Sequence, residues 1–496
     1  MSPTPPLKRL HVDERPPPYS ILSSSKLRAL VDDCEGITNK SVHCIELERR
    51  LHKANYPPLD SPSLSWDGFP NKFKSLVLSN FVTHTTSLSC SQTSSDGSTT
   101  KLLIKLNDGH MVESVIMRHE TGRTTLCVSS QVGCKMGCTF CATGTMGIIG
   151  DLSEGEILEQ LVWANKELGF GGNEGGRRGG VRNIVFMGMG EPLNNFTHVR
   201  LAVEGMVNTK QFGLGHGHVT VSTVGVTPKI KRLTREMPYV NLALSLHAPN
   251  QEMRSKIVPA AKAYKIEGII EALDEHMRGG GERGEEGKSK KKQKVRKAMI
   301  QYTMLNGPTS TFACAHELGA LCKGKNIIVN LIPYNQTDVK DEYSCPSMEH
   351  IEKFQEIVME YGLYVFIRKT MGEDIAGACG QLVLEKKREE RQEEKKVDIE
   401  DALGMRGGNG GGKGGRGERV KVTGKRRGKE ATEGGRKEAE EGDGDEWKAE
   451  SKEAIVKEGQ GSGSADVVLK VGTAIGVGMI GAAAIWAIRS KRRVVA

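Results

Sequence analysis

The stretch TTLCVSSQVGCKMGCTFCATG, Thr124 to Gly144, places a β-branched run directly before three cysteines. Cys134, Cys138 and Cys141 are spaced four and then three residues apart in a glycine-punctuated loop. A structural zinc ion takes four protein ligands, and a cubane iron-sulfur cluster has four irons to satisfy. Three thiolates therefore leave one metal position open, where a substrate or cofactor can bind.

The run at the start of this stretch is the first of seven similar runs. Six runs rich in β-branched residues begin near Thr124, Arg182, His218, Val240, Arg296 and Asn326, and a seventh begins at Tyr364. Most of them are followed by a loop and a helical pattern. This alternation predicts an α/β fold with a parallel sheet, either an open doubly wound sheet or a partial barrel. In both, functional residues gather at the carboxyl ends of the strands.

Two segments precede the repeat. Residues 25–98 begin with a helical pattern and predict a small accessory domain that we expect to bind RNA. Residues 99–122 hold two hydrophobic runs around Asn107 to Gly109, which predict a hairpin with a primed turn. We expect residues 1–24 to be disordered.

The composition changes after residue 385. Residues 386–466 are charged and glycine-rich, and they bury too little surface to offset their chain entropy, so we expect disorder. Residues 467–489 contain an uncharged apolar run, and we expect a membrane anchor there, with a weakly apolar surface tail as the alternative.

The bulk composition allows a nucleic-acid partner and favours a reducing compartment. The formal net charge of +9 is compatible with a polyanion, although part of the excess lies in the tail. Eleven scattered cysteines without the apolar core of a signal peptide indicate metal ligands or catalysts rather than disulfides.

A second motif, FMGMGEP, follows the second predicted strand. Gly190 lets the backbone approach a ligand, and Glu191 can accept a hydrogen bond from an ammonium group. With the CxxxCxxC spacing, this motif resembles the radical S-adenosylmethionine (SAM) superfamily. Its members hold a 4Fe-4S cluster with three thiolates and leave the fourth iron to SAM. The resemblance implies a partial (β/α)6 barrel over residues 123–385; the alternative is a zinc site completed by Cys127 or His119.

Four longer motifs narrow the resemblance. TLCVSSQVGCKMGCTFC, LSLHAPN, LIPYN and EDIAGACGQL together resemble the RlmN/Cfr family, whose members methylate carbon 2 or carbon 8 of an adenine in RNA. The resemblance extends from Leu103 to Leu382, and the CGQL ending favours the RlmN branch, which acts at carbon 2. It implies an rRNA substrate with tRNA as the second candidate, and an electron donor of the flavodoxin or ferredoxin type. It also implies a monomeric catalytic core in the cytoplasm, held at a membrane if the predicted tail anchor inserts.

The resemblance also assigns roles to residues. Cys379 would be methylated by one SAM molecule, and a second would be cleaved to a radical that activates this methyl group, so two are used per turnover. Cys127 would release the product by forming a transient disulfide with Cys379, for which a lowered pKa is expected. Glu113, by itself an exposed strand carboxylate, would accept a proton. The implied cluster ligands are Cys134, Cys138 and Cys141, and the implied SAM-binding residues are Gly190, Glu191, Ser222, Ser245, Leu246, His247 and Asn335.

Two other functions stay open from the sequence. One is a different radical SAM modification of RNA, such as methylation at carbon 8. The other is a non-catalytic, metal-binding RNA scaffold tethered to a membrane.

Overall fold

The computed structural model describes residues 8–170, 180–278, 298–337, 339 and 343–382. They belong to one compact unit, Met1–Asn409, and the second unit, Gly410–Ala496, lies outside the described residues. The segments predicted to be a disordered tail, 386–466, and a membrane anchor, 467–489, also lie outside them. Within the described ranges, no helix has the length and apolar character needed to cross a membrane.

A ten-stranded sheet forms the centre of the unit, in the order β14-β13-β12-β11-β10-β9-β6-β5-β4-β3. Its parallel strands are β6 (Thr124–Cys127), β9 (Asn183–Phe186), β10 (Val219–Thr223), β11 (Asn241–Ser245), β12 (Ala298–Met304), β13 (Ile327–Pro333) and β14 (Tyr364–Ile367). Neighbouring strands in space are also consecutive repeats in sequence. The sheet ends at β14 and β3 rather than closing on itself, as in a partial barrel.

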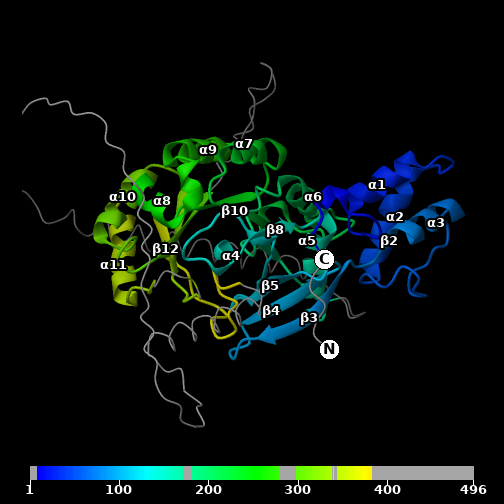
Figure 1. The fold of residues 1–496 in the computed structure, drawn as a ribbon, viewed down its shortest axis with the longest axis horizontal. Coiled ribbons are helices and arrows are strands. Elements are labelled where there is room, and N and C mark those ends of the chain that lie inside the picture. Colours follow the sequence, from blue (N-terminus) through cyan, green and yellow to red (C-terminus); the bar gives the residue numbers. More distant parts are fainter. Residues whose placement is uncertain (1–7, 171–179, 279–297, 338, 340–342, 383–496) are drawn as a thin grey trace, which may run out of the picture. The chain divides into compact units, whose positions relative to one another are not determined.

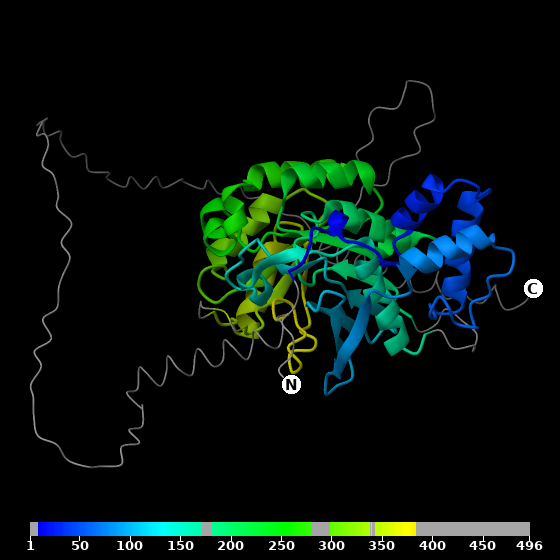
Figure 2. The ribbon, with the colours of Figure 1, turned by 45° about the vertical axis from the view of Figure 1, so that its right-hand side comes forward.

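A helix follows each of the first six parallel strands. These helices are α5 (Glu154–Glu167), α6 (Phe196–Val207), α7 (Thr227–Glu236), α9 (Ile266–Arg278), α10 (Phe312–Cys322) and α11 (Met348–Met359). Figures 1 and 2 show α7, α9, α10 and α11 on the outer side of the sheet. A short helix, α8 (Gln251–Ile257), and the turn η3 (Pro259–Lys262) precede α9. The predicted partial (β/α)6 barrel is therefore confirmed, with β14 as the extra strand.

An antiparallel extension lengthens the sheet beyond β6. It consists of β3 (Thr86–Thr93), β4 (Thr99–Leu106) and β5 (Met111–Arg118). The predicted hairpin is β4–β5, but the primed turn is wrong, because within the loop of residues 107–109 only Gly109 has a positive φ, 86°. The Gly109 amide bonds to the Leu106 carbonyl, so three residues close the hairpin with glycine in the left-handed position.

The chain before β3 is helical, as the sequence predicts for its start. It contains α1 (Ser24–Asp33), α2 (Lys40–Lys53) and α3 (Asn71–Asn80), with a short parallel pair of β1 (Tyr19–Ser20) and β2 (Phe81–Val82). Residues 8–18, which we call the N-terminal arm, include the turn η1 (Val12–Glu14). The described part of the segment predicted to be disordered thus has a defined course.

A small hairpin carries the first cysteine of the trio. Its strands β7 (Gln131–Cys134) and β8 (Gly147–Asp151) pair antiparallel, and the one-turn helix α4 (Ala142–Thr145) lies between them in sequence. This hairpin follows β6, at the carboxyl end of the sheet.

Candidate active site

The three clustered cysteines come from one loop. Cys134 ends β7, Cys138 lies in the turn, and Cys141 caps the amino end of α4. The turn is tight enough that a Cβ on Gly144 would lie 2.9 Å from the Cys138 carbonyl oxygen, so a glycine is needed there. All three thiols are free and line the same pocket.

The chemistry of this donor set fits an iron-sulfur cluster. Burial raises the pKa of Cys134 to about 12 and that of Cys138 well above its usual value, and the neighbouring cysteines add to both shifts. Without metal these groups stay neutral thiols, and a bound cation is what would ionise them. Among the described residues, no three Cys, His, Asp or Glu side chains are grouped to bind a single metal ion. In a 4Fe-4S cluster each thiolate binds a different iron.

Neither residue expected to complete a zinc site, His119 or Cys127, lines the pocket of the three cysteines. His119 shares a hydrogen bond with Thr125, its Nε2 lying 3.0 Å from Thr125 Oγ1, and it does not line the cysteine pocket. Cys127 lines a different pocket.

The cysteine pocket, which we call the cofactor pocket, lies over the carboxyl ends of the parallel strands. It holds about 890 Å³ of empty space, part of it open to solvent. Six of the seven residues expected to bind SAM line it: Gly190, Glu191, Ser222, Ser245, His247 and Asn335. The side chain of the seventh, Leu246, is fully buried and does not line it.

Glu191 is a buried carboxylate that suits an ammonium ligand. Its two oxygens accept hydrogen bonds from the backbone amides of Leu193 (3.0 Å) and Val224 (2.9 Å). Burial nevertheless raises its pKa to about 7. No lysine, arginine or histidine among the described residues forms an ion pair with it. A bound ammonium group would supply the missing charge.

Polar groups on β10, β11 and β12 complete this wall of the pocket. The hydroxyls of Ser222 and Ser245 lie 3.2 Å apart, so both can face one ligand. His247 has a φ of 61°, which a non-glycine residue seldom adopts, and its Nδ1 accepts from the Thr303 amide at 3.2 Å. Burial lowers the pKa of His247 to about 3, so the ring is neutral and Nε2 carries its proton.

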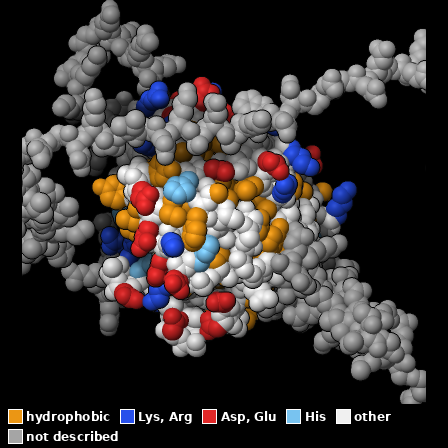
Figure 3. Space-filling view, turned by 90° about the vertical axis from the view of Figure 1, so that its left-hand side faces the viewer, with side chains coloured by type: hydrophobic (Ala, Val, Ile, Leu, Met, Phe, Trp, Pro, Cys, Tyr) orange, Lys and Arg blue, Asp and Glu red, His pale blue; other side chains and the backbone are white. Residues whose placement is uncertain are grey.

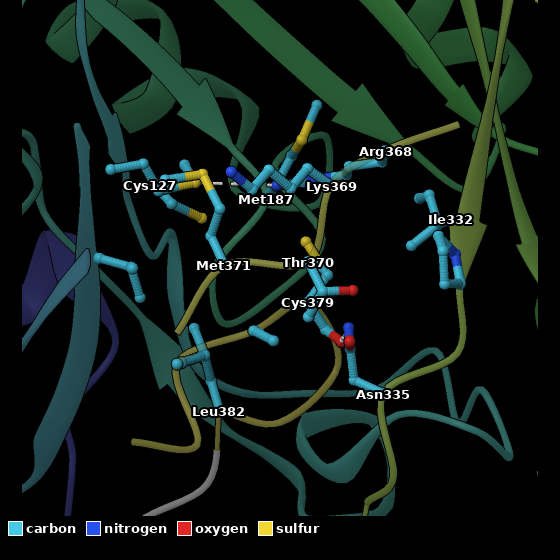
Figure 4. A pocket seen from close by; sticks show the side chains of 15 residues that line it. Cys127, Met187, Ile332, Asn335, Arg368, Lys369, Thr370, Met371, Cys379 and Leu382 are labelled. Carbon is cyan, nitrogen blue, oxygen red and sulfur yellow. Dashed lines mark hydrogen bonds between the residues drawn. The ribbon is translucent and has the colours of Figure 1, made fainter. Parts of the chain in front are cut away.

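A second pocket adjoins the first. Cys127, at the end of β6, and Cys379, in the loop after β14, both line it, with Arg368, Lys369 and Met371. Figure 4 shows Cys127 and Cys379 entering this pocket from different segments. Cys379 also lines the cofactor pocket, whereas Cys127 does not. We call this second space the reaction pocket.

The lowered pKa expected for Cys127 is wrong for this structure. Burial, with a smaller contribution from the charge of Cys379, raises the Cys127 pKa to about 12, and the opposing effects of Arg368 and the Met187 amide are weaker. The sequence showed the cation Arg368, but it did not show how deeply the Cys127 side chain is buried. Cys127 is therefore a thiol until a base or a bound substrate changes its surroundings.

Backbone contacts hold the Cys379 loop against the cluster loop. The Ala142 amide donates to the Gly380 carbonyl (2.9 Å), and Thr143 Oγ1 donates to the Leu382 carbonyl (2.6 Å). Asn335 Nδ2 donates to the Cys379 carbonyl at 3.1 Å. The loop of the three cysteines and the Cys379 loop, far apart in sequence, thus form one wall of the cofactor pocket.

Glu113 is buried, not exposed as the strand pattern suggested. Only 1% of its surface is accessible, and Lys101 Nζ lies 3.7 Å from its Oε1. Glu113 shares a face of β5 with Val115 and Met117, which line the reaction pocket, but does not line it itself. Its role as a proton acceptor stays a prediction.

The sequence reasoning missed Arg254, the largest fully buried side chain in the structure. Arg254, on α8, donates to the carbonyls of Val224 and of Leu246 (3.1 Å), at the ends of β10 and β11. Its charge opposes the raised pKa of Cys138. An arginine just after LSLHAPN was visible in the sequence, but nothing there indicated its full burial or its interaction with Cys138.

Comparisons with known proteins show which proteins the chain is similar to. Residues 128–281 match the family model of the Radical SAM superfamily. The chain is 39% identical over 314 residues to a dual-specificity RNA methyltransferase RlmN of Clostridium tetani, covering 63% of this chain and 82% of the relative. It is 38% identical over 295 residues to a ribosomal RNA large subunit methyltransferase N of Nitrosopumilus maritimus, covering 58% and 78%. The crystal structure of a radical SAM methyltransferase from Sphaerobacter thermophilus aligns with a TM-score of 0.62 at 31% identity, covering 74% of this chain and 99% of that one.

Proposed function

The chain belongs to the RlmN family of radical SAM RNA methyltransferases, and we propose that it methylates carbon 2 of an adenine in ribosomal RNA. One observation carries the proposal. Cys379 lies on the wall between the cofactor pocket and the reaction pocket, and Cys127 lines the reaction pocket only. A carbon carrier must reach both spaces, whereas a residue that only releases the product needs to reach one.

The target atom explains why a carrier is needed. Carbon 2 of adenine lies between two ring nitrogens and is electron-poor, so it cannot displace the methyl group of SAM as a nucleophile. When bound, the 4Fe-4S cluster and SAM would supply one electron and a radical that removes hydrogen. We propose that two SAM molecules are used per turnover, one to methylate Cys379 and one for this step.

The two cysteines divide the remaining work. The Cys379 sulfur carries the methyl carbon, and this carbon forms the new bond to adenine. The adduct then loses one electron and the proton of the methylated ring carbon. The Cys127 thiolate attacks the Cys379 sulfur and a disulfide forms, while the carbon-sulfur bond breaks with its electron pair on the product carbon, which takes up a proton to become the methyl group. Two electrons from the donor, which we propose is a flavodoxin or ferredoxin type protein, then reset the thiols.

Because burial keeps Cys127 in its neutral thiol form, a base is needed to accept its proton. We propose that Glu113 accepts the proton, from the same face of β5 that lines the reaction pocket. Lys101 Nζ lies 3.7 Å from Glu113 Oε1 and forms an ion pair with this carboxyl.

Cations at the reaction pocket support an RNA substrate. Arg368 and Lys369 follow β14 and line this pocket, where they can contact phosphates beside an unstacked base. Figure 3 views the molecule from the side of α10 and α11, where acidic side chains gather near the lower edge of the visible surface. That face is poorly suited to RNA, so we place the RNA at the mouth of the reaction pocket.

The finer assignments follow the family. A tRNA adenine is the second substrate candidate, since one relative is named a dual-specificity enzyme. We also propose a monomeric catalytic core in the cytoplasm. The membrane anchor predicted at residues 467–489 is tested by deletion below.

The test is the position of the methyl group. Anaerobically reconstituted protein is incubated with reductant, methyl-labelled SAM and rRNA or tRNA, and the nucleosides are compared with 2-methyladenosine and 8-methyladenosine by mass spectrometry. We expect label in 2-methyladenosine. Label in 8-methyladenosine would assign carbon 8 instead, and absence of methylation by iron-loaded protein would favour a non-catalytic scaffold.

A further inference from the structure

Gln131 joins the cluster hairpin to the SAM-binding carboxylate. It is the first residue of β7 and is 2% exposed. Its Nε2 donates to Asp151 Oδ1 at 2.6 Å, and its Oε1 accepts from the Glu191 backbone amide at 2.8 Å. Gln131 and Asp151 are paired residues of β7 and β8, so the contact crosses the hairpin directly.

The chemistry of these two contacts requires an amide at position 131. A carboxylate only accepts hydrogen bonds and a backbone amide only donates, so the bridging group must donate at one end and accept at the other. Position 190 is also pressed against Gln131. Gly190 has a φ of 101°, and a Cβ there would lie 2.6 Å from the Gln131 Cβ.

The backbone of Asp151 is held by the N-terminal arm. The Asp151 carbonyl accepts from Arg9 Nη2 (3.0 Å) and Arg15 Nη2 (2.6 Å). Arg9 and Arg15 both form ion pairs with Glu156 at the start of α5, at 2.8 and 2.7 Å. A shift of the end of β8 would therefore break its hydrogen bonds to two arginines that Glu156 holds in place.

We infer that Gln131 and Asp151 form a positioning pair that aims Glu191 at the ammonium group of SAM. The inference rests on the proposed function, which places SAM at Glu191. The Glu191 carboxylate is held by the amides of Leu193 and Val224, and its backbone is held by Gln131. Neither Gln131 nor Asp151 lines the cofactor pocket, so both act through Glu191.

An exchange of the two side-chain types tests the pair. Gln131→Glu alone sets two carboxylates against each other, and we expect SAM affinity to fall about tenfold, the loss of roughly one buried hydrogen bond. Gln131→Glu with Asp151→Asn keeps the formal charge and restores the bond, because the new amide donates to the new carboxylate. We expect this double variant to bind SAM within about twofold of wild type.

Two single variants complete the comparison. Asp151→Asn alone can still accept from Gln131 through its amide oxygen, so we expect a smaller loss of SAM affinity than in Gln131→Glu. Gln355→Glu repeats the glutamine change on α11, where the side chain donates to the Val365 carbonyl, away from the cofactor pocket.

Affinity is measured by anaerobic equilibrium dialysis with labelled SAM, alongside iron content and RNA affinity, which should stay unchanged. In iron-free protein, hydrogen exchange of a peptide spanning residues 188–193 should be faster in Gln131→Glu and normal in the double variant. Wild-type affinity in Gln131→Glu, or a double variant as weak as the single, would overturn the positioning pair. Iron-loaded wild-type protein that binds no SAM would overturn the proposed function instead, and the exchange measurement would still judge the pair.

Discussion

At the scale of the residue, the arrangement of the two cysteines proposed to be catalytic is asymmetric. Cys379 lines both pockets and Cys127 lines only the reaction pocket. Removal of the residue that transfers carbon should prevent the adduct with RNA from forming. Removal of the residue that only cleaves this adduct should leave the adduct trapped. This difference can be measured as trapped covalent product.

We expect Cys127→Ala to form a covalent protein-RNA adduct and to stall. The methyl carbon is attached to Cys379 before it bonds to adenine, and no thiol is left to attack the Cys379 sulfur. Cys379→Ala should form no adduct, and the double variant should behave like Cys379→Ala. Denaturing gels with labelled RNA measure this. An adduct from Cys379→Ala, or full turnover by Cys127→Ala, would reverse the assigned roles.

The cluster ligands make a separate prediction. Cys138→Ala should lose iron and SAM cleavage together, because two thiolates are too few for the cluster. Cys345→Ala removes an exposed thiol that lines neither pocket and should retain both. Iron analysis and the yield of 5'-deoxyadenosine decide this, and normal cleavage by Cys138→Ala would refute the ligand assignment.

At the scale of the element, the N-terminal arm and the start of α5 hold the cluster hairpin. Arg9, with a side chain 1% exposed, bonds to Asp108 in the β4–β5 turn, to Glu156 and to the Asp151 carbonyl. Ser153 and Glu156 form a capping box at the start of α5. Glu156 therefore both caps this helix and pairs with Arg9. Three segments distant in sequence are joined at one arginine.

Arg9→Met should lower the free energy of unfolding by about 3 kcal/mol, because Asp108 loses its buried cation and Glu156 keeps only Arg15. Arg49→Met is the matched control, since Arg49 is exposed on α2 and pairs with Glu46 one turn away. Chemical denaturation of the two variants measures the difference. Equal stabilities would show that the arm is not held by this contact.

Glu154, also at the start of α5, predicts a pH dependence of stability. Burial raises its pKa from 4.5 to about 7, so the folded state binds its proton more tightly than the unfolded state does. The stabilisation is complete below pH 4.5 and is lost as the pH rises to about 7, by up to about 3 kcal/mol. Glu154→Gln should remove this part of the slope in denaturation curves at several pH values. An unchanged slope would assign the dependence to other carboxyls.

At the scale of the whole molecule, the elements that carry the site all lie between Arg9 and Leu382. We therefore expect deletion of residues 386–496 to leave RNA methylation unchanged in vitro. Deletion of residues 467–496 should also release the protein from the membrane fraction if the predicted anchor inserts. A wholly soluble full-length protein would count against the anchor, and loss of methylation would give the tail a catalytic role.

The sequence by itself determined the seven strands, their parallel arrangement and the loop of three cysteines, because these features follow from local periodicity and spacing. The pattern left a doubly wound sheet and a partial barrel open, and the tertiary structure shows the consecutive strand order of the partial barrel. Only tertiary structure decided how far Glu113 and Cys127 are buried, and burial rather than neighbouring charge sets the pKa of Cys127. Tertiary structure alone also placed Arg254 at the ends of β10 and β11 and Gln131 between Asp151 and Glu191. These contacts depend on distances between segments 20 to 60 residues apart, and no local pattern encodes such distances.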